Sequence, residues 1–436
     1  MMIDESTTLF DLTEAYPQAI SILVTSGFRR MEDPALRRQF GSSITIEAAA
    51  LARGYDAQEF LSRIRRGIGL DGEGAATGEA PAGSAASGHR SNTVRIMGLV
   101  PCPIRVPMTQ VMESASQQFT TTTGIDVEFD LQAAYTGTEW MEENLGDHPT
   151  AQDLPEVFLS AGFRLFFTDH RFRRLRAEGA FADRTGWKEM NAFARANDLQ
   201  DPEHRFSVVG VVPAVFMVNR TLLGDRPVPK TWAEVLTPEF ENSLALPVGD
   251  FDLFDALLLG VHRSFGMSGV EQLARNMFQQ MHPAQMVAGA RTADPPGGAT
   301  GGATGGSIGG ATGGQPLITI MPYFFTRTIT ESSPLIPVWP EDGALAAPIL
   351  LVTRRDRPEI QPLIDTIAGE SMSRVLSKLG LFPSTHPKNG DFAPEEHPLQ
   401  WPGWDQLLSD DLPDTLQRTT DTFERIIAER HQAVVV

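Results

Sequence analysis

Side chains able to hold a small polar molecule occur in a few short segments of this sequence. Residues 98–105 follow an apolar, strand-like stretch and contain Cys102, with a proline on each side, and Arg105. Prolines restrict the backbone and present neighbouring side chains rigidly, and a guanidinium holds a carboxylate or oxyanion through paired hydrogen bonds. We expect Arg105 to contact a ligand, its alternative being a surface ion pair. Cys102 is either a second contact or a buried thiol in a stiff loop.

Two further segments combine small or acidic residues with the start of a helix. Ser160 and Gly162 follow the buried strand 157–159, where small residues let backbone N–H groups approach an anion. Asp250 and Asp252 lie at the start of the next helical segment. We expect one of these aspartates to cap that helix. The other is free to coordinate a cation or to accept hydrogen bonds from a ligand.

The remaining candidates are His282 and Gln285, which flank a proline turn, and Tyr323, which follows the strand 317–321. A soft metal site built from His282, Asp250 and Cys102 has no HxxxH or CxxC spacing to support it. A nucleophilic role for the cysteine lacks a recognisable base or Gly-x-Ser-x-Gly motif. The sequence therefore predicts ligand contacts but no catalytic residue, metal site or cofactor.

The composition limits the classes of partner. The 436 residues contain 36 Lys and Arg against 55 Asp and Glu, a net charge of −19, which would repel a nucleic acid. The single cysteine excludes an internal disulfide or a multi-thiolate zinc site. No apolar run approaches the roughly 20 residues that cross a bilayer. The acidic start, Met1 to Ser6, is unlike a secretory signal, so we expect a cytoplasmic protein, with a periplasmic location as the alternative.

The chain is expected to contain two folded parts. Residues 1–70 show apolar residues at helical spacing in short segments and predict a small helical domain. Residues 71–91 are rich in Gly, Ala and Ser and predict a flexible linker. A second Gly-rich tract, about 295–316, predicts a disordered insertion in the larger domain.

Residues 92–436 alternate strand and helix patterns and predict an α/β fold. The expected strands are 94–97, 127–131, 157–159, 208–218, 243–246, 317–321 and 347–352, and the expected helices are 109–119, 232–236, 254–265, 269–280, 359–368 and 370–379. Ligands bind at the carboxyl ends of strands in open α/β sheets. The loops at Gly98, Ser160, Gly249 and Pro322 are therefore the expected binding loops.

Several passages resemble the type II periplasmic solute-binding proteins of ABC transporters, in the branch that includes ferric-ion binders. An apolar strand ending in Asn219 precedes the Pro-Lys-Thr-Trp-Ala-Glu-Val-Leu segment at 229–236, and a closing helix at 367–380 precedes Leu-Phe-Pro-Ser at 381–384. The resemblance covers about residues 92–436. It implies two α/β lobes joined by crossing strands, with a ligand held between them and released by hinge motion. The family's adjacent tyrosine ligands for iron are not matched, because Tyr323 is followed by Phe324 and Phe325.

Residues 1–70 resemble a small helical domain of unknown function, through the segments 16–19 and 26–28. Copies of that domain often place cysteines after the glycine of the second segment, whereas Arg29, Arg30 and Met31 follow here. Together these features predict a cytoplasmic binding module that captures a small polar or anionic ligand, in preference to a metal ion. The helical domain would contact a protein partner. The alternatives are an enzyme on the same fold that uses Cys102 or His282, and an extracytoplasmic binding protein coupled to a transporter.

Overall fold

The chain divides into two compact units, Met1–Ser91 and Asn92–Val436. The computed structural model describes residues 3–4, 7–17, 19–20, 23, 31, 37, 44–46, 49–50, 60–61, 64–65, 93–133, 145–247, 252–281, 315–329, 333–390 and 397–435. The expected linker 71–91, and the glycine tract 295–316 except for its last two residues, lie outside the described residues.

The first unit is a small domain with its own apolar core. Helix α1 (Leu9–Ala15) begins after Thr8, whose hydroxyl accepts a hydrogen bond from the amide of Asp11. A threonine in this position satisfies one of the free amides of the first turn. The buried apolar residues of this core are spaced through the described part of the unit, namely Ile3, Leu9, Leu12, Ala19, Leu23, Met31, Ile46, Ala49, Ala50, Phe60, Leu61 and Ile64.

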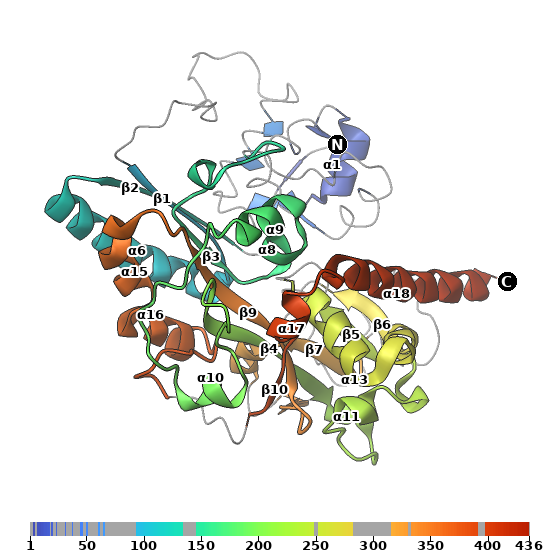
Figure 1. The fold of residues 1–436 in the computed structure, drawn as a ribbon. Coiled ribbons are helices and arrows are strands. Elements are labelled where there is room, and N and C mark those ends of the chain that lie inside the picture. Colours follow the sequence, from blue (N-terminus) through green and yellow to red (C-terminus); the bar gives the residue numbers. More distant parts are fainter. Residues whose placement is uncertain are drawn as a thin grey trace. The chain divides into compact units, whose positions relative to one another are not determined.

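The second unit is built on a sheet in the strand order β2-β1-β3-β9-β4-β7-β5-β6, with β8 beside β4 and β10 beside β9 (Figure 1). The strands are β1 (Thr93–Val100), β2 (Asp126–Ala133), β3 (Val157–Ser160), β4 (Ser207–Asn219), β5 (Leu244–Pro247), β6 (Met277–Met281), β7 (Ile318–Pro322), β8 (Leu335–Val338), β9 (Ala344–Thr353) and β10 (Leu399–Gln400). Strands β1, β2 and β3 are parallel to one another, as are β5, β6 and β7. The predicted α/β class is confirmed.

Strand β4 divides its pairing between two groups of strands. Residues 207–213 pair with β9, which in turn pairs with β3, whereas residues 214–219 pair with β7 and β8. All 13 residues of β4 are buried. We call the part around β1, β2 and β3 lobe one and the part around β5, β6 and β7 lobe two. Figure 1 shows β4 and β9 between the two groups, as expected for crossing strands.

Helices follow the strands in both lobes. The described helical elements of this unit are α6 (Cys102–Thr123), η4 (Ala151–Asp153), α8 (Arg164–Thr168), α9 (His170–Ala177), α10 (Ala192–Ala196), α11 (Arg220–Leu223), α12 (Trp232–Val235), η5 (Pro238–Phe240), α13 (Leu253–Asn276), η6 (Tyr323–Thr328), η7 (Pro358–Ile360), α15 (Gln361–Ile367), α16 (Glu370–Arg374), η8 (Val375–Leu379), α17 (Trp404–Leu407) and α18 (Leu412–Val435). Of the described helices, none is long and apolar enough to span a membrane.

Two expectations about these elements are wrong. The stretch 98–105 is not a loop, because β1 runs to Val100 and α6 begins at Cys102 with Pro103 in its first turn. Proline suits a first helical turn, where its missing N–H has no partner to lose. The segment expected as helix to residue 280 ends at Asn276, because residues 277–281 form β6 and pair with β5. Sheet pairing here overrides the local helical pattern.

A buried ion-pair network holds the amino-terminal end of β3. Glu156 is 3% exposed and its carboxylate lies 3.1 Å from the guanidinium groups of Arg354 and Arg357. The amide of Arg95 donates to the same carboxylate at 2.7 Å. Each charge of the network has hydrogen-bonding partners, which offsets the cost of its burial. The network connects β1, β3 and the end of β9.

Candidate functional site

The turn that follows β3 places two backbone amides at the carboxyl end of the lobe one strands. Ser160 ends the strand and is 6% exposed, and the amide of Ala161 donates to the carbonyl of Leu99 at 2.8 Å. The chain then turns into α8, which begins at Arg164. The first amides of a helix have no partner within the helix. The amides of Phe163 and Arg164 are therefore available to an acceptor from outside.

That acceptor is Asp252, which comes from lobe two. One carboxylate oxygen, Oδ2, accepts hydrogen bonds from the amides of Phe163 and Arg164, each at 2.6 Å. Asp252 occupies the N-cap position of α13, yet its side chain makes no hydrogen bond to that helix. The structure thus brings together two segments, 160–164 and 252–255, that lie about ninety residues apart in the sequence.

The absence of a side chain at residue 162 makes this contact possible. A Cβ atom built on Gly162 would lie 2.5 Å from Asp252 Oδ2 and 3.0 Å from its Cγ. Such distances are too short for non-bonded heavy atoms. The glycine therefore leaves the space into which the carboxylate fits.

A second pair of charges lies beside the first. The guanidinium of Arg164 lies 3.1 Å from the carboxylate of Asp255, which is in the first turn of α13. The Asp255 side chain is 11% exposed and that of Arg164 is 58% exposed. The pair is open to solvent on the arginine side, so we assign it little stability of its own.

Burial raises the pKa of both aspartates, and the charge of Asp255 adds to the rise at Asp252. Burial, followed by the charge of Asp255, raises the pKa of Asp252 to about 6, against the opposing effect of the two amides and of Arg164. Burial also raises the pKa of Asp255, and Arg164 opposes that shift. Two carboxylates that share one site favour the protonation of one of them.

Of the other predicted site residues, three follow the carboxyl ends of β1 or β7, and three lie outside the described residues. Arg105 is half-buried in the second turn of α6, and within the described part of the chain its guanidinium makes no hydrogen bond or ion pair. Cys102 is the first residue of that helix. Tyr323 begins η6 and its ring packs edge-on against Trp339 at 5.2 Å. Asp250, His282 and Gln285 lie outside the described residues.

Sequence reasoning missed two arginines that act between the lobes, Arg164 and Arg327. The Arg327 guanidinium, from η6, donates to the carbonyls of Lys378 and Leu379 at the end of η8. The sequence around either arginine does not distinguish it from an ordinary surface arginine. Only the position of Arg164 directly after the Ser-Ala-Gly-Phe turn offered a signal.

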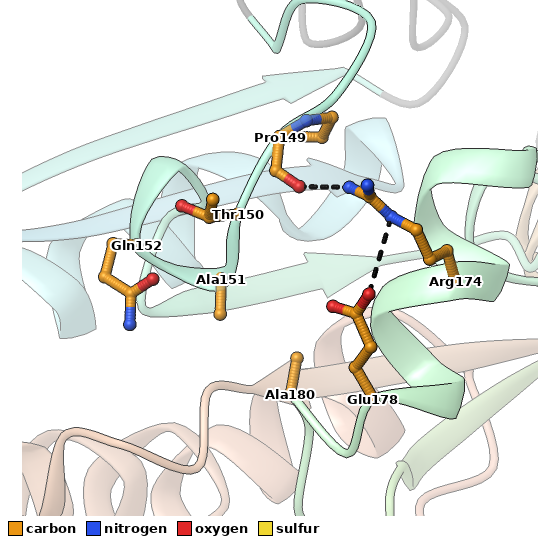
Figure 2. A pocket seen from close by; sticks show the side chains of 7 residues that line it. All are labelled: Pro149, Thr150, Ala151, Gln152, Arg174, Glu178 and Ala180. Carbon is orange, nitrogen blue, oxygen red and sulfur yellow. Dashed lines mark hydrogen bonds and ion pairs between the residues drawn. The ribbon is translucent and has the colours of Figure 1, made fainter.

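One hollow lies away from the Asp252 contact, and a second lies at its edge. The first, about 320 Å³, lies near the amino-terminal end of β3 and is lined by Pro149, Thr150, Ala151, Gln152, Arg174, Glu178 and Ala180 (Figure 2). There the Arg174 guanidinium is held by the carbonyl of Pro149 and lies 3.8 Å from Glu178. This is the end of the strand opposite the turn, so it is not where an open α/β sheet binds ligands.

The second hollow, about 210 Å³, lies between α8 and α18 and is lined by Arg164, Thr168, Pro413, Leu416, Gln417 and Thr420. It adjoins the Arg164–Asp255 pair. Among the described residues there is no cluster of three or more His, Cys, Asp or Glu side chains placed to hold a metal ion. The chemistry that the described site offers is hydrogen bonding to a negative group by backbone amides.

Comparison with known proteins supports this architecture. Residues 152–410, more than half of the chain, match the family described as bacterial extracellular solute-binding protein. Residues 3–61 match a domain of unknown function, DUF1858. A comparison with curated proteins finds no match.

Solved structures show the same fold at low sequence identity. The periplasmic binding protein P5PA is 12% identical, with a TM-score of 0.51, over 77% of this chain and 99% of that one. IdiA (FutA) from Trichodesmium, solved in complex with iron and citrate ligands, is 12% identical, with a TM-score of 0.50, over 77% of this chain and 99% of that one. The predicted two-lobed, type II periplasmic-binding-protein fold is confirmed.

Proposed function

This chain belongs to the bacterial extracellular solute-binding protein family, and from that premise we propose that it captures a small polar or anionic molecule between its two lobes. The observation behind the choice of ligand class is the turn at 160–164. Its two adjacent amides donate to a carboxylate at 2.6 Å, so the turn has the geometry to hold a negative oxygen. Charge-assisted hydrogen bonds from backbone amides suit carboxylate and phosphate groups.

Arg105 supports the same ligand class. It is half-buried near the carboxyl end of β1, which neighbours β3 in the sheet, and its guanidinium has no partner among the described residues. A cation in this position adds charge attraction to the hydrogen bonds of the turn. We propose that Arg105 contacts the ligand together with the 160–164 turn.

Native mass spectrometry of the purified full chain tests the proposal. We expect a retained small molecule, identified after denaturation, that raises the melting temperature when it is added back, because a ligand at about 100 times its Kd contributes about 2.7 kcal/mol. Arg105→Ala should weaken that shift. The matched control is Arg425→Ala, which removes an arginine whose ion pairs, to Glu271 and Glu429, are on the surface. No retained mass, together with no shift from phosphate, citrate or a set of amino acids, would count against the proposal.

We also propose that the protein acts in the cytoplasm and that the small N-terminal domain contacts a protein partner. The family's description as extracellular favours the other compartment, so cell fractionation is the direct test. Release of the protein with the periplasmic fraction would contradict the cytoplasmic proposal. A photo-crosslinker in place of the exposed Glu14 tests the second point, since a partner at this domain should give a defined crosslinked band in cells.

A further inference from the structure

Two charged side chains of lobe two bind backbone groups at the ends of two different helical elements of lobe one. Asp252, at the start of α13, accepts from the amides of Phe163 and Arg164. Arg327, in η6, donates to the carbonyls of Lys378 and Leu379. In each case the charge of the side chain suits the backbone groups that it binds. The carboxylate accepts from amides at the start of a helix, and the guanidinium donates to carbonyls at the end of one.

From these contacts we propose that Asp252 is a latch that holds the lobes closed without ligand, and that Arg327 assists it from a second point. The inference rests on the proposed function, because a latch regulates only a cleft that opens. It also assigns a role to the carboxylate that the capping pattern does not explain, since Asp252 makes no side-chain hydrogen bond to its own helix.

The fit around the carboxylate argues that the contact is specific. Both hydrogen bonds converge on one oxygen at 2.6 Å, and Gly162 leaves the space that this oxygen fills. The neighbouring charges on the two elements that meet here are Asp255 on α13 and Arg164 on α8, which pair with each other. Helix α8 also contacts α18, which packs on α13 and bounds the 210 Å³ hollow, and Phe167 of α8 lies against Trp404 of α17.

While the latch is closed, the amides of Phe163 and Arg164 are occupied. A ligand that needs these amides has to replace the carboxylate of Asp252. The amides of Phe163 and Arg164 are satisfied either by Asp252 or by the ligand. The latch would therefore select for ligands whose negative group binds these amides better than the carboxylate of Asp252 does. Protonation of Asp252 weakens it as an acceptor, and burial together with the charge of Asp255 raises the pKa of Asp252 to about 6.

The distance between the lobes can be measured directly without any ligand. In a Cys102→Ser background, spin labels at Glu178→Cys in lobe one and Glu239→Cys in lobe two report lobe separation by pulsed electron resonance, since both side chains are exposed. Two variants release the latch, Asp252→Ala by removing the carboxylate and Gly162→Ala by filling its space. We expect each to raise the ratio of open to closed molecules about tenfold, as for the loss of a hydrogen-bonded charge.

Matched controls separate the latch from general loosening. Asp411→Ala removes an exposed aspartate whose side chain, within the described part of the chain, bonds to Thr415 and Arg418 of the helix that follows it. Gly390→Ala adds a methyl group where no atom of the described residues outside its chain neighbours lies within 4 Å. Both controls should leave the distance distribution unchanged. Arg327→Ala should shift it in the same direction as Asp252→Ala.

Amide hydrogen exchange of the peptide over 160–167 gives a second readout that does not depend on the labels. It should speed up at Phe163 and Arg164 in both latch variants. Distances and exchange unchanged in Asp252→Ala and Gly162→Ala, with folding intact by tryptophan fluorescence, would overturn the latch. Because no ligand is present, that result leaves the proposed function standing. A lobe shift in a protein that never retains or responds to a ligand would instead defeat the proposed function alone.

Discussion

The substitution Asp252→Asn tests the electrostatic description of the site. Asparagine keeps an oxygen that accepts from the amides of Phe163 and Arg164, but it does not titrate. In the wild type, burial and the charge of Asp255 raise the pKa of Asp252 from its ordinary 3.8 to about 6. The folded protein therefore binds a proton more tightly than the unfolded chain does. The stability that this proton contributes is complete below about pH 4 and is lost as the pH rises through 6.

The size of the effect follows from the shift. A change from 3.8 to about 6 corresponds to about 3 kcal/mol between the two ends of the range. Relative to Asp252→Asn, the free energy of unfolding of the wild type should fall by that amount between pH 4 and pH 7 and then stay level. The asparagine variant should be the more stable protein at neutral pH.

Urea unfolding followed by tryptophan fluorescence measures this difference for the larger unit alone, because all six tryptophans lie beyond residue 92. Asp411→Asn is the control. Hydrogen bonds to Thr415 and Arg418 lower the pKa of Asp411. Relative to Asp411→Asn, the wild type should therefore show no fall in its free energy of unfolding between pH 4 and pH 7. Parallel curves for wild type and Asp252→Asn across pH 4–7 would refute the reasoning, because a normally titrating carboxylate contributes no such slope.

Three further changes test the packing of the larger unit by the same urea assay. Glu156→Gln should cost about 1–3 kcal/mol, because it removes the buried carboxylate that Arg354 and Arg357 share while Asp356 still pairs with Arg354, and no measurable loss would contradict the network. Arg176→Met should stabilise by about 1–3 kcal/mol, since the Arg176 Nη1 is buried with no hydrogen-bond partner among the described residues, and a clear loss would show that the guanidinium is satisfied. Gly260→Ala should destabilise by about 1–3 kcal/mol, since its Cβ would lie 2.0 Å from Leu345, and neutrality would show that β9 yields there.

Much of the fold was readable from local pattern. Apolar runs placed β4, β5, β7 and β9 within a few residues of their observed bounds, because buried strands are continuous apolar segments. The helix expected at 232–236 corresponds to α12, and in the structure Thr231 caps it. The pattern failed at residues 277–281, where pairing with β5 decided the structure. It also left α18 unassigned, a helix with an amphipathic pattern that follows the last recognised motif.

The site was only partly predictable. Gly162 and Asp252 were both named as candidate ligand contacts, each from the type of turn in which it lies. That they contact each other was not foreseeable, because sequence separation gives no distance between segments on different lobes. Arg327 was missed for the same reason, since its partners are backbone carbonyls, which every sequence contains.

The sequence by itself determined the alternation of strand and helix, the small helical domain at the N-terminus and the resemblance to solute-binding proteins, because these depend on periodicity and on short ordered motifs. The tertiary structure decided what the carboxylate of Asp252 does. A helix-start aspartate satisfies either its own amides or those of another element, and the choice depends on which donors the fold brings within 3 Å. Here β4 and β9 bring lobe two against the turn after β3, and Gly162 leaves room for the carboxylate to reach across.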